Sequence, residues 1–242
     1  MNFILFYILA FISEIIGTIG GFGSSIFLVS LAGFYFDFQT VLAITALMHV
    51  FSNISKLILF RKDINMRLLL LIGIPAVIFV IIGSWLSTIL FLKYAELTLG
   101  IFLILFSIFF FWKPDFQLKQ SKPNAIMGGT VSGFLAGLIG TGGAIRGLSL
   151  AAFNLEKSSF IATSAAIDFF VDLSRAVVYL NHDYLEKEYY VIIPVLVFIA
   201  FAGSYAGKMI LKKLTNAQFK NIVLSLILLI GLVMVWKTIT AN

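Results

Sequence analysis

The chain of 242 residues contains no cysteine, only two histidines and few charged residues. The missing cysteines exclude disulfides and thiolate metal sites. The two histidines, His49 and His182, supply too few ligands for a histidine-based metal centre, and the hydrolase signatures H-E-x-x-H and G-x-S-x-G do not occur. We therefore expect a protein that is not an enzyme and that holds no metal or other cofactor.

The scarcity of charge points to a membrane protein. Charged residues make up 12% of the chain, hydrophobic residues 61%, and the mean hydropathy is +1.08. A soluble domain of this size would need far more polar surface to cover its core. Apolar runs such as 68–92 and 94–112 are long enough to cross a bilayer as helices, and they lack the alternation of a β-barrel strand. The sequence predicts an all-helical protein that crosses a membrane several times.

The chain nearly repeats itself after 119 to 120 residues. The sequence G-T-I-G-G-F-G at 17–23 aligns with G-L-I-G-T-G-G at 137–143, and the run 44–60 aligns with 163–179. Duplicated membrane segments that are interrupted by glycine at matching places are typical of transporters.

Each repeat is predicted to hold five apolar segments, of which the first two are short and meet at the glycine cluster. The repeats are 1–112 and 124–242, joined by a polar cytoplasmic linker at 113–123. The predicted segments are 3–20, 24–36, 40–60, 67–91, 94–112, 124–141, 144–154, 159–180, 189–211 and 221–237. The short pairs are either two spans or a re-entrant hairpin, which gives eight to ten membrane segments.

Loop charges predict the orientation of the repeats. The loops at 61–67, 113–122 and 208–220 carry net charges of +2, +2 and +4, whereas the loop at 183–188 carries −2. Cationic loops tend to stay in the cytoplasm. Two inverted repeats with both termini outside satisfy this rule, and we place them in the inner membrane of a prokaryote. The overall charge of +6 then reflects cytoplasmic flanks that face anionic lipid, and it requires no nucleic-acid partner.

The two glycine clusters are candidate substrate sites. Glycine allows a positive φ and a close approach of the backbone, and a helix that restarts there directs free N–H groups at an anion. The residues with this predicted role are Gly20, Gly21, Gly23, Ser24, Gly140, Thr141, Gly142 and Gly143. The alternative is close helix packing, which we prefer for the isolated pairs Gly133/Gly137 and Gly203/Gly207.

A polar stripe on the third segment of each repeat adds charged candidates. The stripes lie on one helical face at i, i+4 and i+7, and they consist of His49, Asn53 and Lys56 in the first repeat and of Asp168, Asp172 and Arg175 in the second. We expect the two cations and the asparagine to contact the substrate, and the histidine and the aspartates to serve coupling or gating. In the alternative, both cations extend to the headgroups and Asp172 only neutralises Arg175.

Two further ionisable residues, Arg146 and Glu14, have no like-charged counterpart in the other repeat. Arg146 follows the second glycine cluster by three residues and is a candidate substrate clamp, with an interfacial position as the alternative. Glu14 is a candidate proton-coupling carboxylate, with an ion pair or an interfacial position as the alternatives.

A glycine motif near the start of each repeat, followed by a helix rich in Ala, Thr and Ser that ends in a cation, resembles the sulfite exporter TauE/SafE family of membrane permeases. The residues that carry the resemblance are the motif at 137–143, the run Ala-Thr-Ser-Ala at 162–165, Arg175, Gly83 and Gly203. The resemblance covers 14–236 and implies transport of a small sulfur-containing anion, such as sulfite or an organosulfonate, across the cytoplasmic membrane.

We therefore expect a secondary transporter that moves this anion by alternating access between two inverted repeats. A proton or a sodium ion is the expected coupling ion, and the lipid bilayer is the other partner. The competing class is a helical scaffold or assembly protein that transports nothing.

Overall fold

The fold is described from a computed structural model. It describes residues 3–20, 23–60, 63–89, 95–113, 116, 119, 121–151, 153, 155–211 and 213, and the short stretches 224–225, 228–229, 231–232 and 235–236. These residues form helices and no strand, which confirms the predicted all-helical class. The predicted last segment, 221–237, lies largely outside the described residues, as does Gly21 of the first glycine cluster.

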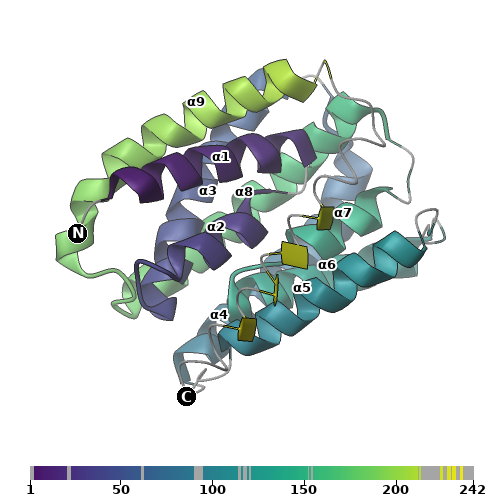
Figure 1. The fold of residues 1–242 in the computed structure, drawn as a ribbon. Coiled ribbons are helices and arrows are strands. Elements are labelled where there is room, and N and C mark those ends of the chain that lie inside the picture. Colours follow the sequence, from purple (N-terminus) through teal and green to yellow (C-terminus); the bar gives the residue numbers. More distant parts are fainter. Residues whose placement is uncertain are drawn as a thin grey trace.

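The helices follow the predicted apolar segments closely (Figure 1). They are α1 (Ile4–Gly20), α2 (Ser25–Ala32), α3 (Phe38–Phe60), α4 (Met66–Ile89), α5 (Ala95–Trp112), α6 (Lys122–Ile139), α7 (Gly143–Ala151), α8 (Lys157–Asn181) and α9 (Ile193–Leu211), with a 3₁₀ turn η1 (Lys187–Ile192) before α9.

Local signals set several of the helix ends. Asp37 precedes α3, and its Oδ1 accepts the backbone N–H groups of Gln39 and Thr40, each at 3.0 Å. The Ser121 hydroxyl likewise accepts the Asn124 N–H at the start of α6. These caps occupy donors that have no partner within the helix.

The helices pack as two bundles that exchange one helix between the repeats. In the first bundle, α1, α2 and α3 of the first repeat pack with α9 of the second repeat. In the second bundle, α6, α7 and α8 of the second repeat pack with α4 of the first repeat. The bundles meet chiefly where α3 lies against α8 (Figure 1). The contact between bundles therefore involves the two helices that carry the polar stripes.

Glycine residues allow α6 to pack closely on α4 and α9 to pack closely on α1. A side chain at Gly133 or Gly137 of α6 would collide with the backbone carbonyls of Ala76 and Val80 on α4. A Cβ at Gly207 of α9 would lie 2.9 Å from the Ile15 carbonyl oxygen of α1. The missing side chains let the helix backbones approach each other, as expected for small residues in membrane helices. The predicted packing role of these glycines is confirmed.

We expect Gly133→Ala to destabilise the protein and Gly73→Ala to leave it as stable as the wild type or slightly more so. Both substitutions add one methyl group to a helix interior and gain the same helix propensity. At Gly133 the methyl group meets the α4 backbone, whereas at Gly73 its nearest neighbours are side-chain atoms at 3.5 Å. Overpacking of this kind costs about 1–3 kcal/mol. Thermal unfolding in detergent measures the difference, and equal midpoints for the two variants would contradict the packing role.

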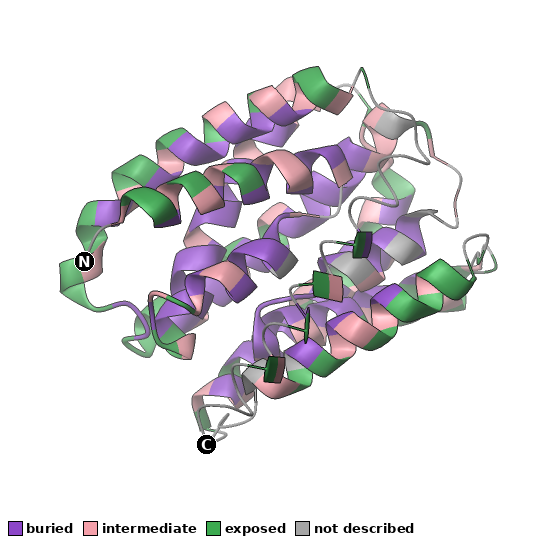
Figure 2. Ribbon diagram, in the orientation of Figure 1, coloured by how far each residue is buried: buried purple, intermediate pink, exposed green. Residues whose placement is uncertain are grey.

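The outer surface is apolar, as a bilayer requires. On α4, Leu70, Ile74 and Ile78 are 51–54% exposed and recur every four residues along one face. Figure 2 shows buried residues along the inner helices and exposed ones on the outer faces of α1, α5 and α9. Three helical stretches of 23, 24 and 25 residues in the described part of the chain, Phe38–Phe60, Met66–Ile89 and Lys187–Leu211, are long and apolar enough to cross a membrane. At 23 residues a helix is about 35 Å long, which matches the thickness of a bilayer.

Candidate functional site

Both glycine clusters interrupt a helix, as the sequence predicts. The helix α6 ends at Gly140, whose φ of +78° is left-handed and whose N–H donates to the Ala136 carbonyl. The chain then restarts as α7 at Gly143. In the first repeat, Gly23 has a φ of +89° and α2 begins two residues later. Only glycine adopts such angles at little cost, so the clusters place two helix starts inside the protein.

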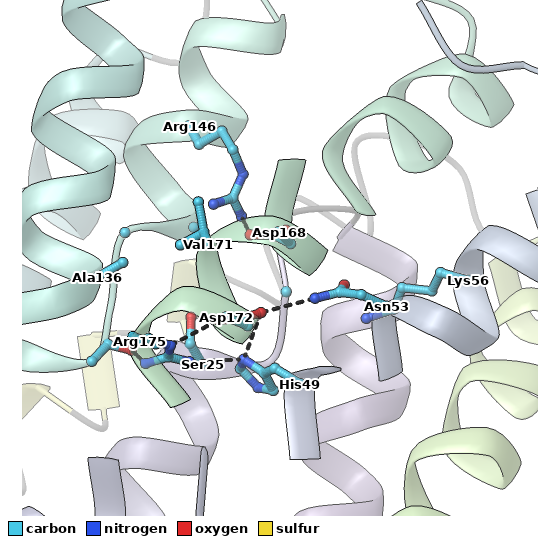
Figure 3. A pocket seen from close by; sticks show the side chains of 14 residues that line it. Ser25, His49, Asn53, Lys56, Ala136, Arg146, Asp168, Val171, Asp172 and Arg175 are labelled. Atoms are coloured by element: carbon cyan, nitrogen blue, oxygen red, sulfur yellow. Dashed lines mark hydrogen bonds and ion pairs between the residues drawn. The ribbon is translucent and has the colours of Figure 1, made fainter. Parts of the chain in front are cut away.

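The polar stripes of α3 and α8 face each other next to these breaks (Figure 3). The Asn53 side-chain amide donates to Asp172 Oδ2 at 2.8 Å. These two residues are repeat mates, 119 positions apart. This hydrogen bond therefore joins α3 to α8 through two residues that align in the duplicated sequence.

Arg175 joins the stripe to the glycine break. Its Nε donates to Asp172 Oδ1 at 2.8 Å, and its Nη1 donates to the Gly140 carbonyl at 3.2 Å. Its Nη2 lies 3.4 Å from His49 Nδ1. The side chain is 1% exposed, so Arg175 does not extend to the headgroups. The i,i+3 pair with Asp172, considered above as an alternative, is present.

Arg146 forms a second buried ion pair on the other side of the cavity. Its Nη2 lies 2.5 Å from Asp168 Oδ1, and the Ser164 hydroxyl donates to Asp168 Oδ2 over a longer 3.4 Å. Arg146 belongs to the first turn of α7, beside the glycine break, whereas Asp168 belongs to α8. This arginine is buried rather than interfacial.

Glu14 forms the third buried ion pair, with Lys56 Nζ at 2.9 Å. The glutamate is fully buried on α1, and Lys56 is 4% exposed on α3. Oε1 of Glu14 also accepts hydroxyl protons from Thr18, Ser52 and Ser204, at 2.6–3.0 Å. In Figure 3 the Lys56 side chain extends away from Asp172 and Arg175. Lys56 and Glu14 therefore tie together α1, α3 and α9.

Ser24 connects this third pair to the cavity. Its hydroxyl donates to Glu14 Oε2 at 2.8 Å and lies 2.9 Å from His49 Nε2. A hydroxyl has one proton, so His49 must donate its Nε2–H to Ser24 and present Nδ1 as an acceptor. Nδ1 is the atom that faces the Arg175 guanidinium. Nδ1 also lies 3.8 Å from Asp172 Oδ2. The shorter contact with the guanidinium favours neutral His49 in its Nε2–H form.

These groups surround a small cavity between the bundles. Its volume is ≈ 10 Å³, enough for about one water molecule. The walls are the two glycine breaks and the facing stripes of α3 and α8 (Figure 3). Each of the three cations is paired with one carboxylate. The site is therefore small and formally neutral.

A family model described as sulfite exporter TauE/SafE matches residues 6–234. The chain belongs to the sulfite exporter TauE/SafE family. It is also 27% identical to a probable membrane transporter protein of Methanocaldococcus jannaschii, in an alignment that covers 95% of this chain and 94% of the relative. No solved structure matches the chain.

The family and the relative agree with the apolar exterior of the helices. The protein is a multi-pass membrane transporter, which is consistent with the expectation that it is not an enzyme. Within the described residues, no three His, Cys, Asp or Glu side chains come together in a way that could hold a metal ion.

Most of the predicted site residues lie at the cavity. Those in its walls are Gly23, His49, Asn53, Lys56, Gly140, Gly142, Gly143, Arg146, Asp168, Asp172 and Arg175. Thr141 is buried in the same loop as Gly140, Gly20 is the last residue of α1, and Ser24 and Glu14 lie behind His49. Gly21 lies outside the described residues. The roles assigned to these residues remain predictions.

Sequence reasoning did not identify the hydroxyl groups of Thr18, Ser52 and Ser204, which donate to Glu14 Oε1. Ser52 lies one helical turn before Lys56 and accepts a hydrogen bond from its Nζ at 2.7 Å. Ser204 belongs to a Gly-Ser pair that recurs in both repeats at Gly83 and Gly203. The recurrence of this Gly-Ser pair and the four-residue spacing of Ser52 from Lys56 are the sequence features that could have identified these hydroxyl groups.

Proposed function

We propose that the protein is a secondary transporter for a small sulfur-containing anion, such as sulfite or an organosulfonate. In this proposal two inverted repeats span the inner membrane of a prokaryote, and both termini lie outside. The observation that carries the proposal is the central cavity, where two helix starts and two arginines surround the same point between the bundles.

The chemistry of the cavity suits an oxyanion. The first turn of α7 presents backbone N–H groups that have no helical acceptor, and Gly142 and Gly143 line the cavity beside them. Arg146 and Arg175 offer planar guanidinium groups that match the oxygens of sulfite or a sulfonate. The family description supports the same class of substrate.

Transport requires the bundles to move apart. Sulfite has a sulfur atom and three oxygens and does not fit a cavity of ≈ 10 Å³. We propose that the moving bodies are the two exchanged bundles and that the contact between α3 and α8 opens alternately to either side. The hydrogen bond between Asn53 and Asp172 then lies near the pivot. In this proposal the two bundles rock against each other, and each bundle contains helices from both repeats.

One observation also fits the alternative, a helical scaffold that transports nothing. Such a protein would satisfy its buried polar groups internally, and the three cations here each have a carboxylate partner. The two functions differ in whether a small anion can enter this network, so a binding measurement separates them.

We expect Arg175→Lys to weaken sulfite and sulfonate binding about tenfold, equivalent to about 1.4 kcal/mol. Lysine keeps the charge but cannot contact Asp172, the Gly140 carbonyl and His49 at once, as the guanidinium does. Ligand-induced shifts of the thermal midpoint, measured with sulfite and a panel of sulfonates, report the affinity.

The matched control is Arg67→Lys, the same substitution at an exposed position in the first turn of α4. It should leave the ligand-induced shifts unchanged. If the wild type shows no shift with any of these anions, the scaffold alternative is favoured. If Arg175→Lys binds as the wild type does, the substrate charge is met elsewhere in the cavity.

A further inference from the structure

The charges around the cavity add up to zero. Lys56, Arg146 and Arg175 are each paired with one carboxylate, and the contacts of His49 with Ser24 and Arg175 favour its neutral form. All of these residues are buried, with exposures of 7% or less. An anion that enters such a site brings a negative charge that nothing compensates, and unpaired charge is costly in a buried environment.

Among the described residues around the cavity, the contacts leave no place for a sodium ion to balance that charge. In transporters sodium often binds the carbonyls of an interrupted helix, but the Gly140 carbonyl at this break already accepts from Arg175. Oε1 of Glu14 contacts three hydroxyl groups and the Lys56 ammonium, which leaves no room for another cation. A proton needs no coordination sphere and only one carboxylate oxygen.

The carboxylates differ in how firmly they are held. Glu14 has the contacts just described, and each oxygen of Asp172 accepts a hydrogen bond at 2.8 Å, from Arg175 and from Asn53. Asp168 has one close partner, Arg146, and a hydroxyl at 3.4 Å. If Arg146 turned to a ligand, Asp168 would lose the one close donor that it has among the described residues. Asp168 is thus the carboxylate best placed to gain a proton.

We propose that one proton enters with each anion and is carried on Asp168. This inference rests on the proposed transport function. The anion oxygens take the Arg146 guanidinium away from Asp168 Oδ1, and that oxygen then binds a proton from the side on which the anion entered. When the bundles open to the other side, the anion and the proton leave together and the ion pair forms again. For a monoanion no net charge crosses the membrane.

Other charged groups near Asp168 set the conditions for this exchange. Helix α7 contributes Arg146, α3 contributes His49 and Lys56, and α8 itself contributes Asp172 and Arg175. Helix α6 contributes Ala136 and the adjacent Gly140 to the cavity wall, neither of which titrates. Once Arg146 binds the anion, the remaining cations keep their own partners and do not compensate Asp168.

The test measures what drives uptake of radiolabelled methanesulfonate and of sulfite by wild-type protein in sealed liposomes. Methanesulfonate keeps a single negative charge across the working range, so pH acts on the protein alone. A pH gradient, alkaline inside, should drive its accumulation by about tenfold per pH unit. A potential imposed with potassium and valinomycin should have no effect. Uptake that follows the potential and ignores the pH gradient would overturn the proposal.

Three variants identify the carrier residue. Asp168→Asn should lose the pH drive and respond to the potential, Asp168→Glu should keep the pH drive, and Asp63→Asn, at an exposed position, should behave as the wild type. If Asp168→Asn folds and keeps the pH drive, the proton is not carried on Asp168. The wild-type result decides the coupling even if that variant does not fold. Absence of any wild-type uptake, by contrast, would contradict the proposed transport function itself.

Discussion

Replacing Glu14 with Gln is expected to lower the free energy of unfolding by about 3–5 kcal/mol. The substitution removes the negative charge that lies 2.9 Å from Lys56 Nζ and leaves that ammonium buried without a counter-charge. It also replaces an oxygen that accepts from three hydroxyl groups on three helices. Thermal and denaturant-induced unfolding in detergent, followed by tryptophan fluorescence, measures the loss.

Two further variants separate the ion pair from general damage. Lys56→Met in the Glu14→Gln background removes the stranded cation and should recover most of the lost stability, because a neutral pair of similar size is often as stable as a buried ion pair. Glu186→Gln, the same change at an exposed position, should have no effect. If Glu14→Gln is as stable as Glu186→Gln, the pair does not stabilise the fold.

The sequence predicted the helices and their interruptions well. Long apolar runs define a membrane helix almost by length alone, and glycine clusters that recur in both repeats mark where helices break. The i,i+4,i+7 spacing placed His49 and Asp168 on faces that meet in the structure. The pair of Asp172 with Arg175 was also accessible, because residues three apart are neighbours on a helix.

The partners of the other two cations could not be predicted. Lys56 and Arg175 align in the duplication, which suggested equivalent roles. Lys56 contacts Glu14, however, for which the second repeat has no acidic counterpart, and Arg175 contacts Asp172. Arg146 finds Asp168 on another helix. Such pairings depend on how helices pack across the molecule, which the alignment of one repeat on the other does not contain.

The exchange of helices between the bundles could not be predicted from the sequence either. The duplication suggested that each repeat would move as one body, but α4 packs on α6, and α9 packs on α1. These contacts depend on glycine faces that match a partner backbone in three dimensions. The small-residue spacing at Gly133 and Gly203 predicted close packing without indicating the partner helix.

Replacing both members of the Arg146–Asp168 pair, with Arg146→Gln and Asp168→Asn together, is expected to reduce anion uptake by about 100-fold, because a buried charged contact to the substrate is lost. The double change should cost little stability, because it leaves two neutral amides where the structure has an ion pair at 2.5 Å. The matched control is Arg67→Gln with Asp63→Asn, the same two changes at exposed positions, and it should transport as the wild type does.

Uptake of radiolabelled sulfite and methanesulfonate into proteoliposomes tests the account most directly. We expect saturable uptake by the wild type well above that of protein-free liposomes, wild-type uptake by the exposed double variant, and background uptake by the Arg146→Gln/Asp168→Asn variant with an unchanged thermal midpoint. Wild-type vesicles that take up no more of either anion than empty liposomes would contradict the account and favour a helical scaffold.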